Sequence, residues 1–150
     1  MQRVETQDAP RPAGHYSQGI AYGGLVYVAG QLPIDPAGRG APGPHGSVAE
    51  QTERTLRNVQ AILEAAGSGL DHLLQVTIYV SEMEHWGEVN EAYARVMGEH
   101  RPARAVVPVK ELHHGYALEI QAIGAQKSRK EEGEGGPEWG DGLEAGQGQR

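Results

Sequence analysis

Cysteine and phenylalanine are absent from this chain, and aromatic residues make up only 5% of its 150 residues. The lack of cysteine excludes a disulfide, a thiolate nucleophile and a thiolate metal site. No stretch approaches the roughly twenty consecutive apolar residues that a membrane-spanning helix needs, and the first residues lack the apolar core of a signal peptide. We therefore expect a soluble cytoplasmic protein without a membrane partner, with a core built mainly from aliphatic side chains.

Basic residues are in the minority. The chain has 13 Lys and Arg against 20 Asp and Glu, which gives a formal net charge of -7. Non-specific affinity for nucleic acid comes mainly from clustered Lys and Arg, so we expect no nucleic-acid partner. A small anionic ligand held by a single arginine remains compatible with this charge.

The length of the chain is typical of one domain with a single modest core. Its composition changes near Gln126, because the residues that follow are mostly Gly, Glu and Lys with almost nothing apolar to bury. This change predicts a single domain over residues 1–126 and a disordered C-terminal tail, rich in glycine and glutamate, over residues 127–150.

The first structural element that the sequence indicates is a tight hairpin. Apolar and aromatic residues flank the pair Gly23 and Gly24, and this pair accepts the positive φ angles of a two-residue turn. The second strand of the hairpin is expected to end at Gly30, where a free backbone amide could bind a carboxylate. Residues 35–46 are dense in Gly and Pro and are expected to form an irregular loop.

A helix is expected to follow this loop. Ser47 can cap its first free amides while Glu50 completes a capping box, and Gly67 ends the helix. One face of this helix carries apolar residues at helical spacing and is expected to be buried: Leu56, Val59, Ile62, Leu63 and Ala66.

The rest of the domain alternates strands with one more helix. Residues 73–80 alternate well enough for a half-buried strand, and the last two strands are expected over residues 104–109 and 116–125. Between the strand over residues 73–80 and the last two strands, an apolar stripe predicts a helix that ends near Gly98. The stripe consists of Trp86, Val89, Tyr93, and Val96 or Met97. The predicted order is β-β-α-β-α-β-β, an α+β fold with two helices packed on one face of a mixed sheet.

Several strands are apolar on both sides, so the face without helices also needs cover. Tyr27 alternates with Val26 and Val28, and Val107 is next to Val106. A cyclic oligomer would bury this face and bring loops of neighbouring subunits together, so clefts between subunits are the expected ligand sites.

A series of motifs in a fixed order resembles the YjgF/RidA family over residues 9–125. The motifs are Gly14-His15-Tyr16-Ser17-Gln18, Val28-Ala29-Gly30-Gln31-Leu32-Pro33-Ile34-Asp35, Ile62-Leu63-Glu64-Ala65-Ala66-Gly67, Val89-Asn90-Glu91-Ala92-Tyr93, Pro102-Ala103-Arg104 and Leu118-Glu119-Ile120-Gln121-Ala122-Ile123. The resemblance implies a chorismate-mutase-like fold and a homotrimer with three inter-subunit clefts.

The resemblance also implies a function. Members of this family hydrolyse reactive enamine and imine intermediates, of the 2-aminoacrylate and 2-iminopropanoate type, to 2-oxo acids and ammonia. The expected enzyme is therefore an imine or enamine deaminase, a hydrolase acting on C–N bonds, with a small carboxylate-bearing substrate. No cofactor and no metal are implied.

The family pattern assigns roles to individual residues. Arg104 matches the arginine that binds the ligand carboxylate, and amides near Gly30 and Val106 could share the same oxygens. Glu119 matches the glutamate that positions the attacking water. Two further residues match positions in the same cleft: Tyr16 and Asn90. Without the family pattern, Arg104 would be interpreted as a solvated residue and Glu119 as an exposed strand carboxylate.

Some positions depart from the family pattern. His15 stands in place of a proline, Ala29 in place of a serine, Val106 in place of a cysteine, and Arg101 in place of an aromatic residue. Each change alters a group near the expected ligand, so the physiological imine stays open.

The pair His113 and His114 is not expected to bind a metal. Adjacent residues of an extended chain point in opposite directions, and no carboxylate lies at ligand spacing beside the pair. A structural role or a position at the rim of the site is favoured. His113 takes the place of a common proline of the family and could contact the ligand.

Two other functions are compatible with the sequence. A non-catalytic binder of small 2-oxo or amino acids would use Arg104 but would not need Glu119. A ribonuclease or inhibitor of translation, as some relatives are described, is disfavoured by the acidic balance and by the lack of a strip of basic and aromatic residues.

Overall fold

The computed structural model describes residues 1–38 and 46–128. Its strands are β1 (Gln2–Val4), β2 (Gly19–Tyr22), β3 (Leu25–Gln31), β4 (Leu73–Val80), β5 (Ala103–Pro108) and β6 (Leu118–Ala125). Its helices are α1 (Val48–Ala65) and α2 (Trp86–Met97). Its short 3-10 turns are η1 (Leu70–His72), η2 (Met83–His85) and η3 (His113–Gly115). The predicted order of elements is confirmed, with one addition, the short strand β1. The predicted tail lies outside the described residues except for Lys127 and Ser128.

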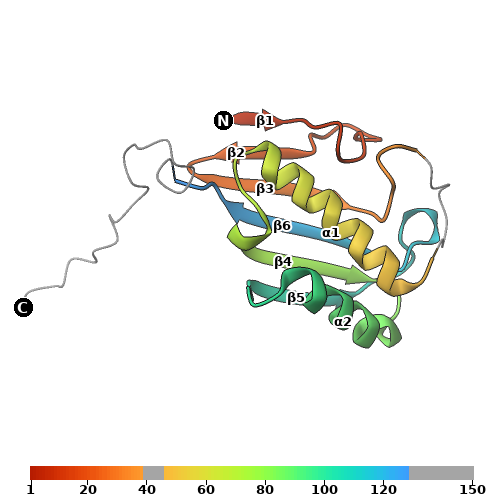
Figure 1. Ribbon diagram of the computed structural model, residues 1–150. Helices are drawn as coiled ribbons and strands as arrows, with labels where there is room; N and C mark the ends of the chain where they lie inside the picture. The colour runs from red at the N-terminus through yellow and green to blue at the C-terminus, as the bar shows by residue number, and fades with distance from the viewer. Residues whose placement is uncertain (39–45, 129–150) are drawn as a thin grey trace, which may run out of the picture.

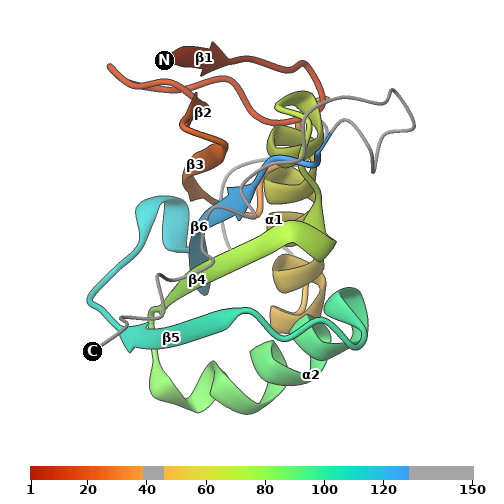
Figure 2. The same cartoon turned by 90° about the vertical axis from the view of Figure 1, so that its left-hand side faces the viewer.

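The six strands form one mixed sheet with the order β1-β2-β3-β6-β4-β5. β4 and β5 run parallel, and all the other neighbouring strands are antiparallel. Both helices lie on one face of this sheet, as predicted (Figures 1 and 2), so neither α1 nor α2 covers the opposite face. Among the described residues, neither helix is long and apolar enough to cross a membrane.

The core lies between the sheet and the helices. Alternate residues of β3, β4 and β6 are buried there: Val26, Val28, Val76, Ile78, Val80, Leu118, Ile120 and Ala122. The predicted apolar face of α1 packs on them, with Leu56, Val59, Ile62 and Leu63 fully buried. Trp86 was expected in the core but is 43% exposed. It begins α2, and the buried stripe of this helix starts one turn later, at Val89.

Turns and caps follow the sequence closely. Gly23 and Gly24 have φ angles of 61° and 80°, as the predicted hairpin turn requires. The Ser47 hydroxyl accepts from the Glu50 amide at 3.1 Å, but the Glu50 carboxylate lies 3.4 Å from that hydroxyl instead of binding the Ser47 amide. Gly67, with a φ angle of 77°, follows the end of α1.

Buried polar residues of α1 form hydrogen bonds with two segments of the chain, one after β3 and one before β6. Asn58 is fully buried, and its amide group donates to the carbonyls of Leu32 at 3.0 Å and Ile34 at 2.9 Å. The Gln51 side chain accepts from the amide of Ala117 at 2.9 Å. The helix thereby fixes the chain just after β3 and just before β6.

We expect Asn58→Ala to destabilise the protein by about 2 kcal/mol, because two partly buried carbonyl groups lose their donor. Urea unfolding followed by circular dichroism measures this change. Gln60→Ala on the same helix serves as the control: the Gln60 side chain bonds only to exposed side chains, so its loss should change stability by less than about 0.5 kcal/mol. Equal midpoints for wild type and Asn58→Ala would show that α1 does not hold this segment.

Candidate active site

Glu119 lies on the sheet face that the helices leave uncovered. Its neighbours Leu118 and Ile120 are fully buried under the helices, so the Glu119 side chain projects to the other side. β3 runs beside it and contains a bulge between Val28 and Gln31. A Cβ atom at Gly30, inside this bulge, would lie 3.0 Å from the Glu119 carboxyl group. Glycine at this position therefore leaves the space that the carboxylate occupies.

The environment of Glu119 favours proton transfer. Burial raises the pKa of its carboxyl group, and the charge of His113 lowers the pKa in part. Among the described residues, no hydrogen bond or ion pair holds the carboxylate. A carboxylate with a raised pKa and free oxygens is suited to take a proton from water.

Arg104 lies on β5, on the same side of the sheet as the helices. It is the register partner of the buried residue Val76 on β4. The guanidinium carbon lies 4.8 Å from the centre of the Tyr93 ring, which belongs to α2. This cation-π contact restrains the direction of the guanidinium group. Burial raises the pKa of Tyr93, and the charge of Arg104 opposes this shift.

The outer side of β5 offers backbone amides. β5 is an edge strand with β4 as its sheet partner, and the amide of Val109 donates to the carbonyl of Val80 on β4 at 2.9 Å. Alternate amides of a strand point to opposite sides, so the amides of Arg104 and Val106 point to the free edge. The Val106 side chain packs against the core instead. An anion at this edge would therefore meet the backbone of Val106 and not its side chain.

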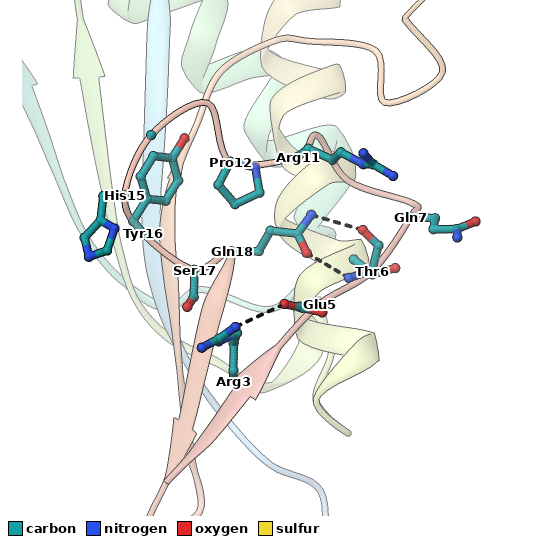
Figure 3. Close-up of a pocket in the computed structure, with 11 residues that line it drawn as sticks. Arg3, Glu5, Thr6, Gln7, Arg11, Pro12, His15, Tyr16, Ser17 and Gln18 are labelled. Atoms are coloured by element: carbon teal, nitrogen blue, oxygen red, sulfur yellow. Dashed lines mark hydrogen bonds and ion pairs between the residues drawn. The ribbon is translucent and has the colours of Figure 1, made fainter.

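Tyr16 lies near the edge of the sheet opposite to β5, in the loop between β1 and β2. This loop and β1 border a groove of about 840 Å³ (Figure 3), and the Tyr16 side chain is 54% exposed. The Tyr16 hydroxyl accepts from the amide of Ala13 at 3.3 Å. The carbonyl of Gln18 accepts from the amide of Ala29 at 2.9 Å, which holds the loop beside the bulge of Gly30.

One chain does not bring all the predicted residues together. Glu119 and Gly30 are in contact on the uncovered face, and the loop of Tyr16 runs alongside them. Arg104 faces the other way, and two strand spacings, about 10 Å, separate β5 from β6. Asn90 lies on α2, one turn before Tyr93, and is therefore on the helix side with Arg104.

Sequence reasoning placed Tyr93 in the core and missed its contact with Arg104. Tyr93 is 7% exposed, so the core assignment is correct, but the same ring also supports the guanidinium group. Local spacing carries no signal for this contact, because it joins a residue of α2 to a residue of β5.

The histidine pair does not have the extended geometry that the sequence suggested. His113 and His114 belong to η3, where His114 has a φ angle of 61°, and their rings stack with centroids 4.3 Å apart. A turn, unlike a strand, lets adjacent side chains lie on one side. Within residues 1–38 and 46–128, no three His, Cys, Asp or Glu side chains gather closely enough to hold a metal ion.

Comparison with known proteins identifies the family. The family model described as endoribonuclease L-PSP matches residues 6–126. The chain belongs to this family, which includes YjgF and RidA. A RutC family protein of Pyrococcus horikoshii is 42% identical over 120 residues, which cover 80% of this chain and 94% of the relative.

Solved structures of the YjgF/RidA family share the fold. A putative endoribonuclease from Thermotoga maritima is 41% identical, with a TM-score of 0.79 over 85% of this chain and 99% of that one. The structure of TdcF from E. coli with bound serine is 32% identical, with a TM-score of 0.78 over 85% of this chain and all of that one. The fold and the family predicted from the sequence are therefore confirmed.

Proposed function

We propose that this protein hydrolyses reactive imines and enamines that carry a carboxylate, such as 2-iminopropanoate and 2-aminoacrylate, to 2-oxo acids and ammonia. The observation that carries the proposal is Glu119, a half-buried carboxylate with a raised pKa that no bond from the described residues engages. A carboxylate in this state is available as the base for an attacking water. A cytoplasmic location, predicted from the sequence, is part of the proposal.

The proposed site is a cleft between two copies of the chain in a homotrimer. Arg104 and Glu119 lie on opposite faces of one sheet, so a ligand that contacts both needs Arg104 of one copy and Glu119 of another. The uncovered face also carries side chains suited to an interface: Tyr27 is 43% exposed and Val107 is 37% exposed. Closed cyclic assembly would bury them and repeat the cleft at each interface.

The positions of the residues support the roles that we propose for them. Arg104, held by Tyr93, binds the substrate carboxylate with two hydrogen bonds, and the free amide of Val106 is available to the same group. Because this contact uses the backbone, valine in place of the family's cysteine leaves it intact. Tyr16 and Asn90 line the two halves of the cleft. Arg101, which is exposed just before β5, adds charge to the rim.

The reaction needs no cofactor. An enamine first takes a proton at its β carbon and becomes the iminium ion. Glu119 takes one proton from water as the oxygen attacks the imine carbon and the π electrons move to nitrogen, which gives a tetrahedral amino alcohol. After the nitrogen is protonated, the C–N bond breaks, ammonia leaves with the bonding pair, and the hydroxyl group loses its proton as the ketone forms.

The direct test generates 2-aminoacrylate or 2-aminocrotonate in place with a dehydratase and follows the release of 2-oxo acid and ammonia. We expect the protein to accelerate the release above the spontaneous rate in proportion to its concentration. Release at the spontaneous rate, across several carboxylate-bearing imines, would refute the proposal.

A second candidate function is the binding of small amino acids or 2-oxo acids without turnover. The bound serine in the structure of TdcF favours it, since serine carries a carboxylate and no reactive imine. Calorimetry with serine and with 2-oxobutanoate would show binding under either function. Binding together with a spontaneous rate of imine hydrolysis would select this second candidate.

We expect Gly30→Ala to lower the rate of hydrolysis about tenfold, because the new methyl group would lie 3.0 Å from the Glu119 carboxyl group and displace it. The flexible glutamate can move, so the melting temperature should change little. Gly87→Ala on α2 is the matched control, since a Cβ atom there meets no atom within 4 Å. Wild-type activity in Gly30→Ala would show that the position of the carboxylate is not critical.

A further inference from the structure

Arg104 is a half-buried charge without a counter-ion in the described part of its own chain. Within residues 1–38 and 46–128, no carboxylate pairs with its guanidinium group and no oxygen accepts a hydrogen bond from it. The interaction that the structure does show is with the ring of Tyr93, whose centre lies 4.8 Å from the guanidinium carbon. An aromatic face attracts a cation and is therefore the compensation that this chain supplies for the charge.

The Tyr93 ring is a fixed part of the core. Tyr93 is 7% exposed and belongs to the buried stripe of α2. α2 lies beside β5 in both views (Figures 1 and 2), so the ring reaches the arginine from a neighbouring element. The arginine side chain is long and has many rotamers, whereas the packed ring has little freedom. The contact therefore orders the arginine more than the tyrosine.

The Tyr93 hydroxyl does not account for this contact. Its oxygen is buried and has no hydrogen-bond partner among the described residues. Burial raises the pKa of Tyr93, so the hydroxyl stays protonated and is not an anionic partner for the guanidinium group. A buried hydroxyl without a partner costs stability, and phenylalanine would avoid that cost. The ring is the part of Tyr93 that acts on Arg104.

We propose that Tyr93 is a positioning residue of the candidate site, whose ring orders the Arg104 guanidinium group before the substrate carboxylate binds. This inference rests on the proposed function, to which it adds a residue that does not touch the substrate. Ordering a rotamer-rich side chain during binding weakens affinity by up to about tenfold, and a group ordered in advance avoids this loss. The gain lies in binding of the carboxylate, so it acts on KM more than on kcat.

The kinetic test compares Tyr93→Phe and Tyr93→Leu with the wild type. Tyr93→Phe keeps the ring, so KM should stay within about twofold of wild type and the melting temperature should not fall. Tyr93→Leu removes the ring and should raise KM about tenfold, with kcat within about twofold. Val89→Ala, in the same buried stripe, is the matched control for lost packing: its melting temperature should fall while KM is unchanged. A raised KM in Tyr93→Phe, or a wild-type KM in Tyr93→Leu, would overturn the inference.

A double-mutant cycle separates positioning from a general structural role. If Tyr93 acts through Arg104, Tyr93→Leu should cause no further loss of kcat/KM in an Arg104→Ala background. Losses that multiply would overturn the inference. Turnover by the wild type in the same assay tests the proposed function separately. If the wild type shows no turnover, the same cycle is measured on the affinity for 2-oxobutanoate by calorimetry.

Proton NMR of the full-length protein tests the contact without turnover and without a ring deletion. Protons held over the face of an aromatic ring are shifted upfield by its ring current. We expect such a shift for the Arg104 side chain, identified by the loss of its signals in Arg104→Lys, and we expect Tyr93→Phe to keep it. Arg104 shifts equal to those of the exposed Arg95 would overturn the inference.

Discussion

Replacing Glu119 with glutamine is expected to lower the rate of imine hydrolysis by about 10²- to 10⁴-fold, the usual contribution of a general base. Glutamine has nearly the same size, so it can fill the space beside Gly30, but its amide cannot take a proton from water. Ligand affinity should be retained, because the proposed anchor of the substrate carboxylate is Arg104. Release of 2-oxo acid measures the rate, and calorimetry with serine measures the affinity.

The pH dependence of the hydrolysis rate tests the role of Glu119 independently. The base works only when ionised, so the wild-type rate should fall with decreasing pH as Glu119 is protonated. Since burial raises the pKa of Glu119, this decline should begin at a higher pH than for an ordinary glutamate. Glu82→Gln, at an exposed position before η2, is the matched control and should keep both the rate and the acid limb. Full activity in Glu119→Gln would remove Glu119 from the mechanism.

Replacing Arg104 with alanine is expected to lower kcat/KM about 100-fold. A bidentate contact with a carboxylate supplies two charge-assisted hydrogen bonds of about 1.5 kcal/mol each, and their loss is close to two powers of ten. Arg104→Lys keeps the charge but not the planar fork, so it should recover only part of the affinity. Arg95→Ala, at an exposed arginine in the last turn of α2, is the control for a general effect of charge. Unchanged affinity in Arg104→Ala would place the substrate carboxylate elsewhere.

Mixing the two inactive variants tests the proposed cleft. If Arg104 and Glu119 come from different copies, a trimer reassembled from Arg104→Ala and Glu119→Gln chains contains some clefts with both native residues. We expect the mixture to recover a substantial fraction of wild-type activity after denaturation and refolding together. If both residues belonged to the same copy, no mixed trimer would contain an intact site and activity would stay lost.

Local features of the fold could be predicted because neighbouring residues decide them. The turn at Gly23 and Gly24 needs two positive φ angles, and the start of α1 needs an oxygen acceptor such as Ser47. The exposed Trp86 was misplaced because helical spacing alone does not say where the packed part of a helix begins. The strand β1 was missed because three residues show no periodicity, and its pairing with β2 depends on a distant segment.

The sequence by itself determined the family, the order of the elements and the identity of the ionisable residues, since all of these depend on residue types and their local spacing. The tertiary structure decided how those residues are combined. Strands separated in sequence pair through backbone groups that every residue carries, so the order β3-β6-β4-β5 is set by the packing of the whole sheet against its helices. That order puts Glu119 beside Gly30, and the register of β5 with β4 turns Arg104 to the opposite face.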